Sequence, residues 1–124
     1  MHPIAQFFAA IAAALHVVIF VMESVLWSKP AIWAKFGVAS QNDADVVKPM
    51  AFNQGFYNLF LAVGIVVGLV LGGSAGDAVV YFACASIVGA AIVLATGGAK
   101  YFRAAFVQGI TPLIALILAA VLQA

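Results

Sequence analysis

The fold is decided by residues 4–27, which read IAQFFAAIAAALHVVIFVMESVLW. A helix that crosses the hydrocarbon core of a bilayer needs roughly 20 mostly apolar residues, and this stretch contains a single acid, Glu23. Similar stretches follow at residues 50–71, 78–96 and 102–122. We therefore predict an all-α protein, a four-transmembrane-helix bundle in up-down-up-down order, which forms a single integral membrane domain over residues 1–124.

The composition agrees with a membrane protein. Hydrophobic residues make up 67% of the chain and charged residues 7%, whereas a soluble domain is about half apolar and about a quarter charged. The net charge of +1 gives no reason to expect a nucleic-acid partner. The sequence has no motif for a metal, nucleotide or phosphate site, so it predicts no metal and names no cofactor.

The links between the predicted spans contain residues that favour turns and helix starts. A glycine-rich segment precedes Asp77, which is predicted to cap the third helix. In the first link, Ser40 and Asp43 resemble a capping box, so the second helix is expected to begin near Gln41, ahead of the membrane. Pro49 would then kink this helix where it enters the bilayer.

The basic residues predict the orientation. All of them lie in or beside the first and third links: Lys29, Lys35, Lys48, Lys100 and Arg103. Because cytoplasmic loops carry an excess of Lys and Arg, these links are expected to face the cytoplasm. The sequence thus predicts a multi-pass protein, of a bacterial inner membrane, with both termini on the non-cytoplasmic side.

Ionisable side chains within a span need a reason, because each costs about 2.5–3.5 kcal/mol at the centre of a membrane helix. The first span contains His16 and Glu23, which are seven residues apart. In an α-helix this is two turns, so both point the same way, about 10 Å apart along the axis. We predict a catalytic proton-transfer pair. The structural alternatives are a neutral His16 bonded to a neighbouring backbone and an ion pair of Glu23 with Lys29 or Arg103.

Further polar side chains gather near the start of the second and fourth spans. In the predicted orientation they lie at the same depth as Glu23, because all three helices meet the cytoplasmic surface there. This predicts a polar layer in the cytoplasmic half of the bundle, with a binding site in it. The predicted binding residues are Trp27, Asn53, Gln54, Tyr57, Asn58, Gln108 and Thr111. The simpler alternative is that such side chains only hydrogen-bond neighbouring helices.

The second span also contains a row of glycines at four-residue spacing, Gly64, Gly68 and Gly72. Small residues at this spacing allow two helix backbones to approach closely. The pattern predicts tight packing, and the partner is either another helix of the same chain or a second subunit.

The run NQGFYN at residues 53–58 is similar to an element of the small membrane proteins grouped as domain-of-unknown-function family 1304, found in bacteria and some fungi. The resemblance extends over nearly the whole chain. It implies a four-helix integral membrane protein and no assigned activity. Other residues that contribute to it are His16, Glu23, Trp27, Gln108 and Pro112.

Three functions fit these features. The first is a membrane-embedded protein that binds or transforms a small apolar, lipid-like molecule in an intramembrane polar pocket, which leaves open whether it is an enzyme. The second is a proton-coupled small transporter that acts as a homo-oligomer, a dimer, through Glu23. The third is a structural or accessory membrane subunit whose polar layer only fixes helix packing. All three have the lipid bilayer as a partner.

Overall fold

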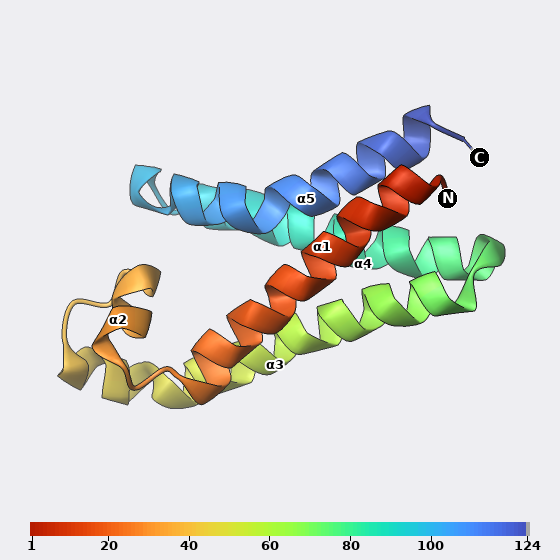
Figure 1. Cartoon of the computed structure of the whole chain (residues 1–124). Coiled ribbons are helices and arrows are strands. Elements are labelled where there is room, and N and C mark those ends of the chain that lie inside the picture. Colours follow the sequence, from red (N-terminus) through yellow and green to blue (C-terminus); the bar gives the residue numbers. More distant parts are fainter. Residues whose placement is uncertain (124) are drawn as a thin grey trace. The chain divides into compact units, whose positions relative to one another are not determined.

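The computed structural model describes residues 1–123, and its regular elements are helices (Figure 1). Four helical segments are long and apolar enough to cross a membrane: Pro3–Val25, Gln41–Leu71, Gly73–Ala95 and Ala99–Val121. This confirms the predicted all-α class and the multi-pass membrane character. In chain order the elements are α1 (Pro3–Phe20), η1 (Val21–Val25), α2 (Pro30–Trp33), η2 (Ala34–Phe36), α3 (Gln41–Leu71), α4 (Gly73–Ala95), η3 (Ala99–Tyr101) and α5 (Phe102–Val121).

The start of the second long helix agrees with the sequence. α3 begins at Gln41, and the backbone N–H of Asp43 donates to Ser40 Oγ at 3.1 Å, as the capping residues predict. This bond satisfies one of the N–H groups that a helix start leaves without a partner. Pro49 lies inside α3, between its first turns and its apolar part.

Two boundaries differ from the prediction. The first span was predicted to run to Trp27, but α1 changes into a π-helical turn after Phe20, and that turn ends at Val25. The third helix begins at Gly73 instead of residue 78, so Asp77 does not cap it. Positive φ angles of 65° at Gly72 and 63° at Gly73 let the chain pass from α3 to α4 over a single residue.

The helices group into two compact units, which we describe separately. Unit 1 comprises Met1–Leu15 and the chain from Leu61 onward, and unit 2 comprises His16–Phe60. α1 and α3 therefore each contribute to both units. The up-down-up-down order and the single domain remain predictions.

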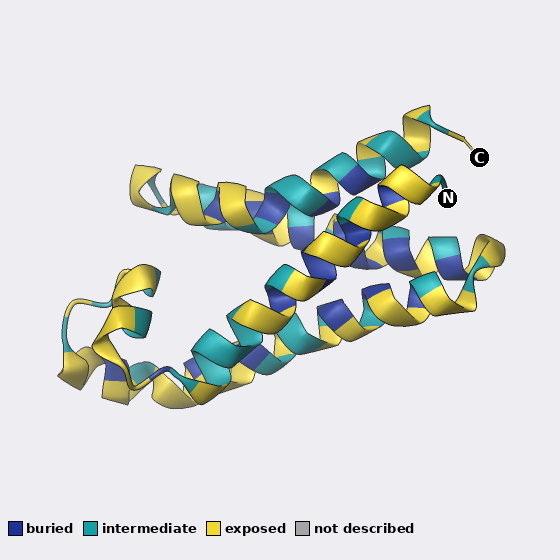
Figure 2. Cartoon of the chain, in the orientation of Figure 1, coloured by how far each residue is buried: buried dark blue, intermediate teal, exposed yellow. Residues whose placement is uncertain are grey.

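Unit 1 has a core built mostly from small side chains. Small residues let helices pack closely, and this packing replaces the hydrophobic driving force that is missing within a membrane. Many of the larger apolar side chains are exposed instead, for example Val70 at 82% and Phe82 at 76%, as expected for surfaces that contact lipid. Figure 2 shows exposed and buried positions alternating along the helices. The buried core residues are Ala9, Ala12, Ala13, Ala62, Ile65, Val80, Ala83, Cys84, Ile87 and Ala115.

The glycine row of α3 packs against α4 of the same chain. A Cβ at Gly68 would lie 2.6 Å from Val80 Cγ2 and 2.7 Å from the carbonyl oxygen of Gly76, and a Cβ at Gly76 would overlap the Gly68 carbonyl. By contrast, a Cβ at Gly64 would meet Ala83 Cβ at an ordinary 3.9 Å. The close contact is therefore at Gly68, while Gly72 serves the turn.

One end of unit 1 brings together the start of α1, the start of α4 and the end of α5. The ammonium group of Met1 forms an ion pair with Asp77 Oδ2 at 3.0 Å. Met1 and Asp77 line a small cleft together with Leu122 and Gln123. Asp77 thus pairs with the residue-1 ammonium group, in place of the capping role that the sequence predicts for it.

The contact at Gly68 yields a prediction with a matched control. Gly68→Ala is expected to lower the thermal stability of the protein in detergent, because overpacking costs about 1–3 kcal/mol and exceeds the roughly 0.5–1 kcal/mol that alanine gains over glycine in a helix. Gly64→Ala has room for its methyl group, so its melting temperature should equal or exceed that of the parent. Circular dichroism on heating measures both. Equal melting temperatures for the two variants would contradict the packing.

Candidate functional site

The candidate site in unit 2 is built on the π-helical turn η1. The backbone N–H of Leu26 donates to the carbonyl oxygen of Val21 at 2.9 Å, five residues back. Such wide turns are rare, occur mostly as single turns, and are frequent at functional sites. Glu23 lies in the middle of this turn.

Gly55 lets the wide turn pack directly on α3. A Cβ at position 55 would overlap Ser24 Oγ, and it would lie 3.0 Å from Ser24 Cβ. Because the glycine leaves this space open, Ser24 Oγ reaches the α3 backbone and donates to the carbonyl oxygen of Phe52 at 2.7 Å. Ser24 thereby anchors the turn, although the sequence did not single it out.

This contact brings Glu23 to Asn58. Asn58 Nδ2 donates to Glu23 Oε1 at 2.7 Å and to the carbonyl oxygen of Gln54 at 3.1 Å. A side-chain amide has two N–H groups, so both are used and the amide is oriented toward the acid. Glu23 and Asn58 are both partly buried. The structure thus joins two of the predicted site residues, and backbone contacts on either side hold them in place.

The ion pair of Glu23 with Lys29, one of the predicted alternatives, is not formed. Within residues 16–60, no lysine forms an ion pair with Glu23, so Lys29 does not neutralise it. In the same residues, no donor is hydrogen-bonded to Glu23 Oε2. One carboxylate oxygen is therefore fixed by Asn58 and the other is open within this unit.

An aromatic row flanks the Gly55 contact on the side of α3 away from Asn58. Phe56 is its centre, and its ring lies 5.1 Å from Phe20, 5.0 Å from Phe52 and 6.2 Å from Phe60 between centroids. The ring planes are inclined to one another, a favourable arrangement for aromatic pairs. The row packs the end of α1 against α3 and so supports the turn.

Trp27 fastens the chain just after the turn. Its side chain is only 5% exposed, and its Nε1 donates to the carbonyl oxygen of Ala44 at 2.9 Å. The ring also lies 5.4 Å from that of Phe36. The single donor of the indole is therefore used within the protein, and in this conformation Trp27 holds the first link against α3.

The remaining predicted residues occupy different surroundings. Asn53, Gln54 and Tyr57 are exposed on α3, and the helical repeat places Asn53 and Tyr57 on the side opposite Gly55. The Asn53–Asn58 run therefore does not act as one face: Asn58 points at Glu23, and the Gln54 backbone supports it.

His16 is fully buried in α1. The predicted alignment of His16 with Glu23 assumes 3.6 residues per turn throughout, and the wider turn at η1 alters that spacing. Their proton-transfer pairing stays a prediction.

Gln108 and Thr111 belong to α5 in unit 1, and both are partly buried. Within the described residues, Thr111 Oγ1 is buried without a hydrogen-bond partner. A shared polar layer of these residues with Glu23 stays a prediction. Among residues 1–123, no three His, Cys, Asp or Glu side chains lie close enough to hold a metal ion.

Four apolar helices with a hydrogen-bonded acid and amide inside them define this chain as an integral membrane protein with polar residues in its spans. The chain belongs to the family described as "Protein of unknown function (DUF1304)", whose family model matches residues 10–120. This confirms the resemblance carried by the NQGFYN run. Comparisons with curated proteins and with solved structures gave no match.

Proposed function

We propose that this membrane protein binds a small apolar molecule whose polar group hydrogen-bonds to Glu23 within the bilayer. The observation behind the proposal is the half-satisfied carboxylate, which accepts from Asn58 on Oε1 and has no donor on Oε2 within unit 2. A carboxylate accepts about four hydrogen bonds, and leaving it partly satisfied away from water is unfavourable. A ligand with a hydroxyl or amide donor would supply what is missing.

A purely structural role explains Glu23 less well. The bonds of Ser24 and Trp27 to backbone carbonyls need no function beyond packing. A glutamine at position 23 would accept the same bond from Asn58 without placing an ionisable group in a membrane span, where such groups are unfavourable. An acid at this position therefore favours use of its second oxygen or of its proton.

The surroundings suggest the class of ligand. The turn forms the last five residues of an apolar span, so a ligand held there has its body beside the hydrocarbon region. A lipid-like molecule with one donor group fits this position, because its body partitions into the bilayer and its donor is directed to Glu23. We propose a binding function only. Proton transfer through His16 would be a further function of the same site.

Native mass spectrometry of the protein extracted from membranes tests this proposal. The parent is expected to carry a bound small molecule, seen as a defined mass increment and identified after release. Glu23→Gln should lose most of this increment, because the single oxygen of the amide still accepts from Asn58 while an NH2 donor replaces Oε2, the acceptor proposed for the ligand. Asp45→Asn removes an acid outside the apolar part of α3 and should retain it.

Two results would contradict the proposal. One is a parent that carries no small molecule under conditions that preserve bound lipids. The other is equal occupancy in the parent and in Glu23→Gln, which would mean that the bound molecule does not depend on the acid.

We further propose that the termini face the non-cytoplasmic side of a bacterial inner membrane. The support is the asymmetry of the five basic residues, all in or beside the first and third links. Fusion of alkaline phosphatase to the C-terminus in a bacterial host should give an active enzyme, and a green fluorescent protein fusion at the same point should be dark. A bright fluorescent fusion with inactive phosphatase would reverse the orientation.

A further inference from the structure

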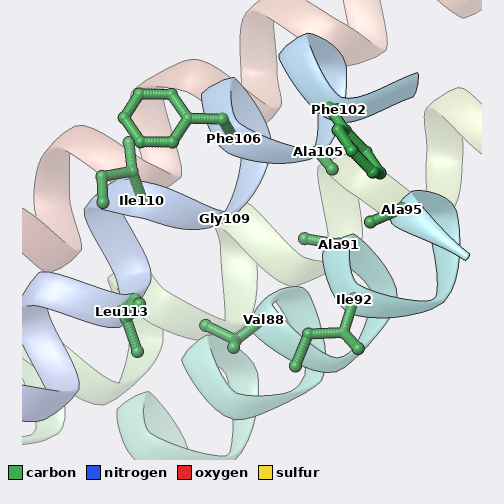
Figure 3. A pocket seen from close by; sticks show the side chains of 10 residues that line it. All are labelled: Val88, Ala91, Ile92, Ala95, Phe102, Ala105, Phe106, Gly109, Ile110 and Leu113. Atoms are coloured by element: carbon green, nitrogen blue, oxygen red, sulfur yellow. The ribbon is translucent and has the colours of Figure 1, made fainter. Parts of the chain in front are cut away.

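An apolar groove of about 290 Å³ runs between α4 and α5 in unit 1 (Figure 3). All of its ten lining residues are apolar or glycine. It extends from Phe102, at the start of α5, to Leu113, a distance of about 16 Å at 1.5 Å per residue. The groove is therefore long and narrow, and it follows the direction of the two helices.

Small residues form the floor of the groove, and larger side chains form its walls. At the floor, Gly109 approaches α4 so closely that a Cβ there would lie 2.8 Å from Ala91 Cβ. Along the walls, Phe102 and Phe106 are 58% and 64% exposed, and Figure 3 shows both rings beside the groove. A flexible apolar chain fits this shape, because it can lie along the small residues and contact the rings.

Two basic residues are close in sequence to Phe102, at one end of the groove. Lys100 and Arg103 flank Tyr101 and Phe102 in the sequence, and both are exposed. Asp77 is the single acid of unit 1, and it pairs with the Met1 ammonium at the other end of α4. No acid of unit 1 therefore compensates the two basic side chains.

The position of these charges makes an anion more favourable still. Basic residues near the start of a helix oppose the helix dipole, whose positive end lies there, and α5 has no acid in its first turn. Lys100 Nζ lies 5.0 Å from the Tyr101 ring centroid, so part of its interaction is with an aromatic face. A negative group at this end would offset the unfavourable interaction of the two cations with the helix dipole.

We propose that the α4–α5 groove binds an anionic phospholipid, with an acyl chain along Ala91 and Ala95 and the phosphate at Lys100 and Arg103. The groove supplies the apolar length and the two cations supply the preference for a negative headgroup, as in other basic sites at membrane surfaces. This site lies in unit 1 and does not depend on the function proposed for Glu23.

Lipid titration followed by native mass spectrometry tests the site, with the purified full-length protein in detergent. Phosphatidylglycerol is expected to bind more tightly than phosphatidylcholine of the same acyl chains. The double variant Lys100→Gln/Arg103→Gln should weaken phosphatidylglycerol binding about 25-fold, since each basic residue near a membrane surface contributes about fivefold. Lys35→Gln/Lys48→Gln removes two cations elsewhere and should leave this affinity unchanged.

A second pair of variants tests the acyl chain. Ala95→Leu fills the groove and should weaken binding of both lipids, whereas Ala104→Leu, on the exposed side of α5 outside the groove, should not. Equal affinity for the two headgroups, or unchanged affinity in Lys100→Gln/Arg103→Gln, would overturn the proposal. So would a dimer that forms without lipid and is lost in Ala95→Leu, because the groove would then hold a second copy.

Discussion

Unit 2 depends on the close approach of the η1 turn to α3 at Gly55. Because position 55 has no side chain, Ser24 reaches the Phe52 carbonyl oxygen at 2.7 Å. That bond and the aromatic contact of Phe20 with Phe56 fix the turn from two sides. Glu23 then meets Asn58 without an ion pair to a lysine of residues 16–60. A single absent side chain thus positions the acid on which the proposed function depends.

The two units show two ways in which a membrane helix pair gains stability without a hydrophobic driving force. Unit 1 uses backbone proximity at Gly68 and Gly76 and an alanine-rich core. Unit 2 uses hydrogen bonds from side chains to backbone carbonyls of α3. The close backbone packing of unit 1 resists substitution by any larger residue, and the hydrogen bonds of unit 2 fix specific polar atoms. These hydrogen bonds leave an acid oriented and half-satisfied.

Hydropathy and turn residues predicted the four spans and the start of α3 at Gln41, because both depend on local sequence. They also identified Glu23 and Asn58, since polar residues in a span are conspicuous. The π turn has no local sequence signal, so the repeat of 3.6 residues per turn that aligns His16 with Glu23 does not extend through η1, and their pairing stays a prediction. Asp77 looked like a cap, but two adjacent glycines already make that turn. Ser24 became important only through its contact with Gly55.

The hydrogen bond between Asn58 and Glu23 is the central claim, and solid-state NMR in bilayers measures it most directly. Glu23 is the chain's single glutamate, so ¹³C at the glutamate side-chain carboxyl reports this residue alone. With ¹⁵N in asparagine side chains, dipolar recoupling should reveal the short carbon–nitrogen separation of a hydrogen-bonded pair, and Asn58→Leu should abolish it. No measurable coupling in the parent, or a coupling that survives in Asn58→Leu, would contradict the account.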